Sequence, residues 1–253
     1  MESSNQVVLV SPLHDPEGRL LNAVKQYGPK LKEIFGTFIK INVTSETNTD
    51  VINEIHNLNI YHEITSKILG QDYRQAINLG LSEENAFILL IDFDRSLHWA
   101  KTYPDELKNV ADDLKHKSGF VIFNRSKRAF ETHPEIQKST EKVTNEIASL
   151  LAGQTVDIMS GAFGFDNSLA KKIIEKGKRD DYGLYAEILK IAIENKSEIN
   201  IFEVEGLEWE TPDQYKKEMD EVGFDAWLKS WESIAEWKER IAIIKDSAEV
   251  LLS

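Results

Sequence analysis

Residues 86–95 have the sequence AFILLIDFDR, a run of apolar residues that ends in two aspartates one residue apart. The uninterrupted apolar residues 86–91 predict a strand buried on both faces, as in the interior of a parallel sheet. Asp92 and Asp94 would then lie at the carboxyl end of this strand, where open α/β sheets bind their ligands. If the segment is extended, both carboxylates point the same way and can share one hard cation. A helix cap or a turn is the alternative interpretation of Asp-Phe-Asp.

Strands and helices alternate along the first half of the chain. Hydrophobic spacing predicts strands at 7–10, 38–43, 59–64 and 86–91, and helices at 19–27, 49–58 and 70–81. Gly28-Pro29 is expected to end the first helix. This alternation predicts an α/β fold with a mostly parallel sheet flanked by helices.

The second half is less regular. Helices are predicted at 104–116, 134–151, 169–176 and 182–195, and strands at 119–125, 155–165 and 199–204, the middle one running into a glycine-rich turn. From residue 211 the pattern is helical. Trp227 and Trp231 share a helical face there, which favours docking to the core or to a second copy of the chain. We therefore expect one α/β domain, residues 1–210, with a C-terminal helical appendage, residues 211–253.

Composition excludes several classes of protein. The 253 residues carry a formal net charge of −13, which argues against a nucleic-acid partner, and the absence of cysteine excludes disulfides and thiolate chemistry. The N-terminal MESSNQ is polar, so no signal peptide is expected. No apolar run approaches the ~20 residues that span a bilayer. These features predict a cytoplasmic protein.

The segment from Arg74 to Asp94, RQAINLGLSEENAFILLIDFD, resembles the stretch around the Asp-x-Asp motif of family 2-like nucleotide-sugar glycosyltransferases with the GT-A fold. The resemblance rests on a helix ending in Asn78-Leu79-Gly80, a short connection, and a buried strand that delivers Asp-x-Asp. It implies a nucleotide-binding half over about 1–95 and an acceptor half over about 96–210. The implied reaction moves a sugar from a nucleotide diphosphate to a hydroxyl group of a small molecule or glycan.

The same resemblance implies a set of site residues. Asp92 and Asp94 would hold Mg²⁺ or Mn²⁺, with Asp94 the more direct ligand, and the metal would neutralise the diphosphate. Asp181 or Asp180 would be the general base, although capping of the next helix also explains both residues. The residues implied in donor binding are Ser11, Pro12, Asp15, Asn78, Asp92, Arg95 and Gly161.

Two features depart from the family pattern. In the family a third metal ligand commonly comes late in the chain and is often a histidine. No histidine follows His133 here, so a late metal ligand would have to be Glu205, Glu208 or Glu210. Arg95, directly after the motif, could bind diphosphate beside the metal or weaken metal binding.

The basic cluster Arg125, Lys127 and Arg128 could hold a phosphorylated acceptor or be solvated loop charge.

Two other functional classes stay open. A phosphatase of the haloacid dehalogenase kind also uses a strand that ends in Asp-x-Asp, with Asp92 as nucleophile, but there the motif normally lies on the first strand. A non-catalytic protein could keep the GT-A-like scaffold without its chemistry.

Overall fold

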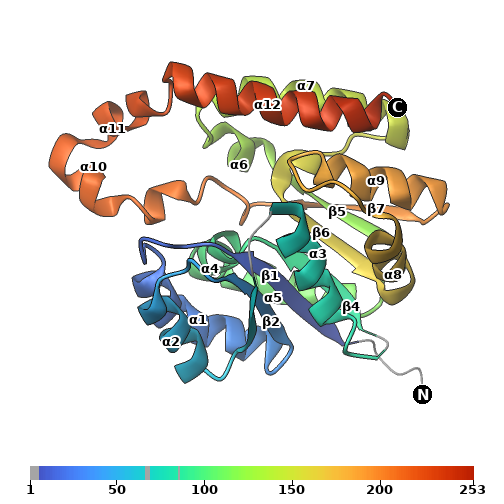
Figure 1. The fold of residues 1–253 in the computed structure, drawn as a ribbon, viewed down its shortest axis with the longest axis horizontal. Coiled ribbons are helices and arrows are strands. Elements are labelled where there is room, and N and C mark those ends of the chain that lie inside the picture. The colour runs from blue at the N-terminus through green and yellow to red at the C-terminus, as the bar shows by residue number, and fades with distance from the viewer. Residues whose placement is uncertain (1–5, 66–68, 85) are drawn as a thin grey trace.

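A seven-stranded sheet lies between two layers of helices in the computed structural model, which describes residues 6–65, 69–84 and 86–253 (Figure 1). The sheet order is β3-β2-β1-β4-β6-β5-β7. Its strands are β1 (Val7–Leu13), β2 (Ile39–Thr44), β3 (Tyr61–Thr65), β4 (Phe87–Ile91), β5 (Phe120–Arg125), β6 (Ala162–Asp166) and β7 (Ile199–Val204). The main helices are α1 (Leu21–Phe35), α2 (Thr49–Asn57), α3 (Leu69–Gly80), α4 (Phe93–Thr102), α5 (Pro104–Leu114), α6 (Lys127–Glu131), α7 (Glu135–Ala152), α8 (Asn167–Lys176) and α9 (Leu184–Glu194).

The central strands are apolar throughout because both of their faces are covered. In β4, Phe87, Leu89 and Ile91 face the core formed with α1, α2, α4 and α5. Ile88 and Leu90 alternate with them and face the second core, formed with α3, α7, α8 and α9. A strand with this two-sided burial requires an apolar residue at every position. The predicted α/β class, with a mostly parallel sheet flanked by helices, is confirmed.

Strand β6 corrects one prediction. The strand expected at 155–165 is a loop followed by a 3₁₀ turn at Ile158–Ser160, and β6 begins only at Ala162. Gly161, with φ of 70°, turns the chain into β6. The strand then runs antiparallel to both neighbours, β4 and β5. Because it is reversed, the loop before it meets the carboxyl ends of the parallel strands.

Helix α1 corrects a second prediction, since it continues through Pro29 to Phe35 instead of ending at Gly28. Leu31 and Phe35 extend the buried face begun by Val24. Proline in a helix interior removes a backbone hydrogen bond, but burial of these two large side chains offsets that loss.

The C-terminal segment contains α10 (Lys216–Val222), α11 (Phe224–Ser230) and α12 (Ile234–Leu251). Helix α12 lies along α7 and also contacts α9 (Figure 1). Trp227 and Trp231 pack on Trp209 of the same chain, with ring centroids 5.4 and 5.8 Å apart. The two tryptophans therefore pack within the chain on Trp209, which belongs to neither of the two core clusters, and docking to the core stays a prediction. Assembly through a second copy, and the domain division at residue 210, stay predictions.

None of the helices in the described ranges has the length and apolar character needed to cross a membrane. Most of the N-terminal MESSNQ, on which the expectation about a signal peptide rests, lies outside the described residues.

Candidate functional site

The Asp-Phe-Asp segment is not extended, which corrects the expected geometry. β4 ends at Ile91, Asp92 occupies the N-cap position, and α4 begins at Phe93, so Asp94 lies in the first helical turn. The helix-cap interpretation therefore describes the backbone. The same interpretation does not apply to the Asp92 side chain, which makes no hydrogen bond to the backbone amides of the first helical turn. Both carboxylates remain at the carboxyl end of β4.

Asp92 is contacted by Tyr73 and Arg95, and Tyr185 supports Tyr73 from a third element. The Tyr73 hydroxyl of α3 donates to Asp92 Oδ1, and the Tyr185 hydroxyl of α9 lies 2.9 Å from that of Tyr73. On the other side, Arg95 Nε is 3.6 Å from Asp92 Oδ2. Burial raises the pKa of Asp92, and burial together with Asp92 raises the pKa of Tyr73 well above its usual range. The tyrosine therefore stays a proton donor to the carboxylate.

Arg95 also reaches a late acidic residue. Its Nε lies 3.6 Å from Glu210 Oε1, and its Nη1 donates to the Ser160 carbonyl. The side chains of Arg95 and Glu210 are only 12% and 8% exposed. Burial opposes the charge on Arg95, but Glu210 and Asp92 together raise its pKa. Within the described part of the chain, Glu210 Oε2 is buried without a hydrogen-bond partner.

Asp94 is a third carboxylate close to Asp92 and Glu210, and it contacts Arg95 at the backbone amide. Its Oδ1 accepts from the Arg95 backbone amide at 2.8 Å, and its Oδ2 accepts from Gln214 Nε2 at 2.8 Å. Burial first, and then the charges of Glu210 and Asp92, raise the pKa of Asp94 to about 7. With its carboxylates ionised, the cluster has two more negative than positive charges.

Close packing brings Glu210 to this cluster. Gly206 lies against the buried Trp99 of α4, and a Cβ at residue 206 would be 1.9 Å from the Trp99 ring, so only glycine fits. The Glu106 carboxylate accepts from Trp99 Nε1 at 2.8 Å and from the Gly206 amide at 2.9 Å. These contacts fix the loop after β7, four residues before Glu210.

Gly161 lies beside the cluster, as the resemblance implies for a donor-contacting glycine. A Cβ there would be 3.4 Å from Asp92 Oδ2 and 3.4 Å from the Tyr185 hydroxyl. Its φ of 70° is also a conformation that side chains disfavour. The backbone can therefore approach Asp92 without filling the space next to it.

A cavity of about 180 Å³ opens next to the two aspartates. Its walls come from the carboxyl end of β1, the first turns of α3 and α4, and the C-terminal segment. The residues that line it include Pro12, Leu13, His14, Asp72, Tyr73, Asp92, Asp94 and Gln214. Of the predicted donor residues, Pro12 and Asp92 thus meet at one cavity.

Two other predicted donor residues near β1 are placed differently. Ser11 is fully buried in β1, and its hydroxyl has no partner among the described residues. The Asp15 carboxylate accepts from the backbone amides of Arg19 and Leu20 at 2.9 and 2.8 Å. Asp15 therefore holds the turn that leads into α1.

The structure does not bring Asn78 or Asp180 to the aspartate cluster, whereas Asp181 lines a small cavity of about 30 Å³ together with Tyr73 and Tyr185. Asn78 is exposed on α3 and does not line the cavity. Asp180 is paired with Arg74, whose hydrogen bond lowers the pKa of that carboxyl. Asp181 Oδ1 accepts from Arg179 Nε at 2.8 Å and from the Gly183 amide at 2.9 Å, as expected for a residue before a helix.

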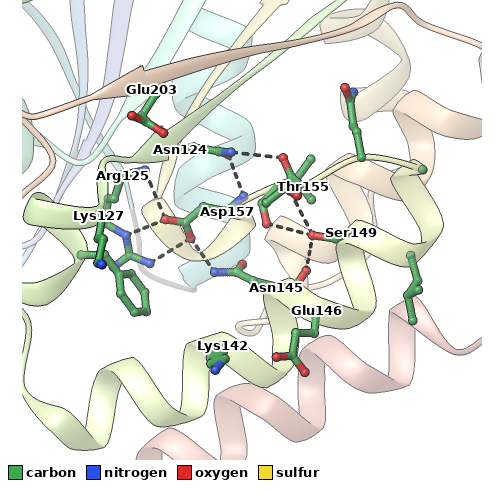
Figure 2. Close-up of a pocket in the computed structure, with 15 residues that line it drawn as sticks. Asn124, Arg125, Lys127, Lys142, Asn145, Glu146, Ser149, Thr155, Asp157 and Glu203 are labelled. Atoms are coloured by element: carbon green, nitrogen blue, oxygen red, sulfur yellow. Dashed lines mark hydrogen bonds and ion pairs between the residues drawn. The ribbon is translucent and has the colours of Figure 1, made fainter.

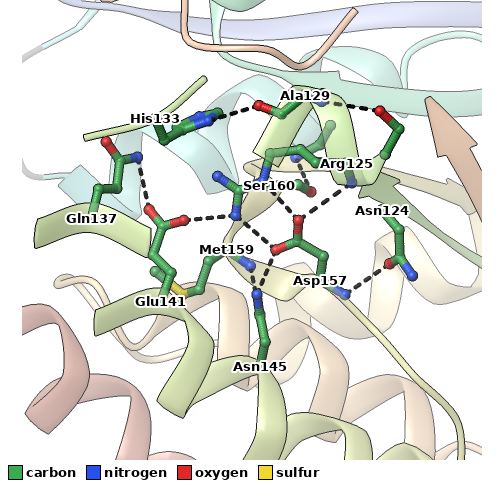
Figure 3. A network of polar contacts seen from close by, with 12 residues as sticks. Asn124, Arg125, Ala129, His133, Gln137, Glu141, Asn145, Asp157, Met159 and Ser160 are labelled. Atoms are coloured by element: carbon green, nitrogen blue, oxygen red, sulfur yellow. Dashed lines mark hydrogen bonds and ion pairs between the residues drawn. The ribbon is translucent and has the colours of Figure 1, made fainter. Parts of the chain in front are cut away.

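The other charged candidates separate into pairs. Glu205 and Glu208 both bind Arg128 at 2.5 Å on the surface, which leaves Glu210 as the late acid near Asp-x-Asp. Arg125 is buried in ion pairs with Asp157 and Glu141 (Figure 3). The basic cluster expected at 125–128 is therefore not a shared anion site.

Sequence reasoning missed Tyr73, Tyr185 and Gln214 as members of the site. The two tyrosines occupy apolar faces of α3 and α9 in the sequence pattern. A buried tyrosine hydroxyl usually has a hydrogen-bond partner, so a tyrosine on an apolar helix face could have indicated a nearby polar residue. Gln214 carried no signal in the sequence.

Among the described residues, no group of three or more His, Asp or Glu side chains is gathered closely enough to hold a metal ion. The chemistry of the donor set nevertheless suits a hard divalent cation, because Asp92, Asp94 and Glu210 offer only oxygen. The unpartnered Glu210 Oε2 and the excess negative charge point the same way.

No protein-family model and no curated protein matches the chain. Among solved structures, it is similar to glucosyl-3-phosphoglycerate synthase from Mycobacterium tuberculosis, in complex with Mn²⁺, UDP-glucose and phosphoglyceric acid, with 9% identity and a TM-score of 0.46 over 79% of this chain and 70% of that one. It is also similar to a protein described as a glucose-1-phosphate thymidylyltransferase from Bacillus anthracis, in complex with a sucrose, with 12% identity and a TM-score of 0.47 over 87% and 96% of the two chains.

These values are too low for either likeness to say what this chain binds. The strand order, the antiparallel β6 and the position of Asp92 after β4 come from the chain's own structure. Together they show a GT-A-like α/β fold, as the sequence resemblance implies.

Proposed function

We propose that the chain is a glycosyltransferase that takes a sugar from a nucleotide-diphosphate donor and transfers it to a hydroxyl acceptor. One observation carries the proposal. Asp92 and Glu210 both pair with the Arg95 guanidinium at the carboxyl end of β4, and Asp92 and Asp94 line a cavity that the end of β1 also lines. In open α/β sheets this edge is the usual place for a nucleotide.

We propose Mg²⁺ or Mn²⁺ as the cofactor, held by Asp94 and Glu210 with Asp92 beside them. When bound, such an ion would act as a Lewis acid on the diphosphate. If all three carboxylates ionise, the cluster carries two more negative than positive charges, and a divalent ion would balance them and let a diphosphate approach. Glu210 Oε2 is a buried carboxylate oxygen that has no hydrogen-bond partner among the described residues.

The remaining side chains have separate proposed roles. The Arg95 guanidinium, already oriented by the Ser160 carbonyl, would offset charge on the departing diphosphate. Tyr73 would keep Asp92 in place through its hydroxyl. Asp181, or Asp180, stays the proposed base, and it would have to leave its arginine partner to accept a proton.

The activity test measures release of UDP or GDP from a panel of nucleotide sugars in the presence of Mg²⁺ or Mn²⁺. Asp94→Asn is expected to lower this release by about a hundredfold, since it removes several kcal/mol of charge stabilisation. Asp112→Asn, an exposed aspartate on α5, is the matched control and should leave the rate unchanged.

Equal rates for Asp94→Asn and wild type would contradict the proposal. The phosphatase alternative makes a different prediction, namely release of inorganic phosphate from phosphomonoesters that depends on Asp92. Phosphate release without nucleotide release would favour that class instead.

A further inference from the structure

A second cavity, of about 940 Å³, lies at the carboxyl ends of β5 and β7 (Figure 2). Its walls come from β5, β7, α6, α7 and the loop before β6. Its size falls in the range of small-molecule sites, which are typically ~300–1,000 Å³. Nothing in the proposed donor site uses this space.

The floor of this cavity is held by a polar network. The side chain of Arg125 is fully buried, and its Nε and Nη2 donate to Asp157 at 2.7 and 2.9 Å, while Nη2 also donates to Glu141 at 2.6 Å (Figure 3). Asn145 Nδ2 donates to the same Asp157 at 2.7 Å. The Phe130 ring lies 4.8 Å from the Arg125 guanidinium carbon. A floor fixed from several elements favours a preformed site.

Unused polar groups surround the opening. Lys127, Lys142, Glu146 and Glu203 are exposed, and in the described part of the chain none of these four side chains makes a hydrogen bond or ion pair. Figure 2 shows them around the cavity, from α6, α7 and β7. One buried group is also free, because Arg125 Nη1 has no partner among the described residues.

The charges of the rim decide the class of ligand. Two lysines and two glutamates balance one another, so a polyanion would meet carboxylates as well as ammonium groups. Hydroxyl groups both donate and accept, and they can use both kinds of side chain. Among the residues that line the cavity, Leu150 and Phe130 offer apolar surface for the C–H faces of a sugar ring.

The cavity is joined to the aspartate cluster by one short loop. Asp157 binds Arg125 at the cavity floor, and the Ser160 carbonyl, three residues later, accepts from Arg95. Only β6 separates β4 from β5 in the sheet. Leu90 of β4 and Ile122 of β5 both pair with Phe163 of β6, and since neighbouring strands are ~4.8 Å apart these two residues lie about 10 Å apart.

We propose that this cavity binds a neutral, polyhydroxylated saccharide. Resting on the proposed function, the inference makes that saccharide the acceptor, presented from the β5 side to a donor held at the end of β4. Glu146 and Glu203 accept hydrogen bonds from its hydroxyl groups, while Lys127 and Lys142 donate to them.

Saturation-transfer NMR and titration on the full chain test this inference. The probes are neutral gluco-, galacto- and manno-oligosaccharides, together with uronate and phosphorylated counterparts. Glu146→Ala and Glu203→Ala are each expected to weaken binding of a neutral oligosaccharide about tenfold, as for loss of a hydrogen bond to a charged group. Glu135→Ala, an exposed glutamate on α7 outside the cavity, is the matched control.

Binding of a neutral oligosaccharide that both cavity variants weaken and Glu135→Ala does not would support the inference. It is overturned if only the anionic probes bind, if no probe binds, or if both cavity variants bind like wild type. Nucleotide-sugar binding measured on the same samples separates the two proposals. Donor binding without saccharide binding overturns this inference alone, whereas saccharide binding without donor binding supports the cavity assignment and contradicts the proposed transfer.

Discussion

Replacing Arg125 by alanine is expected to destabilise the fold by about 3–5 kcal/mol. The side chain of Arg125 is fully buried, and it pairs with Asp157 and Glu141, whose side chains are 11% and 4% exposed. Removing the guanidinium leaves Asp157 without its counter-charge in a low-dielectric environment, and leaves Glu141 with only Arg240, whose Nη1 is 3.8 Å from Glu141 Oε1. Desolvation of the remaining charges, rather than loss of the ion pairs themselves, accounts for most of the expected effect.

Urea unfolding of wild type and Arg125→Ala measures this difference directly. Addition of Glu141→Gln and Asp157→Asn to Arg125→Ala should recover part of the stability, because the stranded charges are then gone. Arg128→Ala is the matched control, since Arg128 is 47% exposed and surface pairs contribute at most about 1 kcal/mol. A loss below 1 kcal/mol in Arg125→Ala, or no recovery in the triple variant, would contradict this view of the network.

Asp94→Asn is expected to stabilise the ligand-free protein at neutral and alkaline pH. The pKa of Asp94 is raised from 3.8 to about 7, about three units, because burial and the charges of Glu210 and Asp92 disfavour its carboxylate. The unfolded chain therefore releases this proton near pH 4, but the folded chain holds it until near pH 7. As the pH rises between these values, the free energy of unfolding of the wild type falls by up to about 4 kcal/mol because of this group. Asparagine does not ionise, so the variant avoids this fall.

The measurement is urea unfolding from pH 4 to pH 8 with a chelator present. Wild type and Asp94→Asn should be equally stable near pH 4, and the variant should gain steadily over wild type up to about pH 7. Asp112→Asn should not produce this gain, because Lys115 lowers the pKa of the exposed Asp112. An Asp94→Asn variant that is less stable than wild type at pH 8 would contradict the prediction, because it would show that folding does not raise the pKa of Asp94.

The sequence predicted the core better than its boundaries. The apolar run 86–91 identifies β4 because two-sided burial leaves no polar position. α4 was missed, since the polar start of the helix at Asp94 and Arg95 hides its pattern. Pro29 suggested an end to α1 that the buried Leu31 and Phe35 override. Local signals fail where tertiary burial determines the outcome.

The sequence predicted the site residues that follow directly after a strand. It did not predict the contacts between side chains that are far apart in the sequence. Gly161 lies beside Asp92, since a Cβ added to Gly161 would be 3.4 Å from Asp92 Oδ2, as a site at one sheet edge requires. Asp180 is 106 residues from its partner Arg74, and no local pattern shows that pairing. Gln214 reaches Asp94 from 120 residues away in the same manner.

The central claim is that a nucleotide sugar binds beside Asp94 with the help of a divalent ion. Thermal unfolding with UDP- and GDP-sugars, each with and without Mn²⁺, tests it on wild type and Asp94→Asn. At a hundredfold excess over its dissociation constant, a bound nucleotide sugar adds about 2.7 kcal/mol, which shifts the melting temperature of a chain this size by several degrees. We expect such a shift in wild type with Mn²⁺ and little shift in Asp94→Asn. No shift with any nucleotide sugar, or equal shifts in both proteins, would contradict the claim.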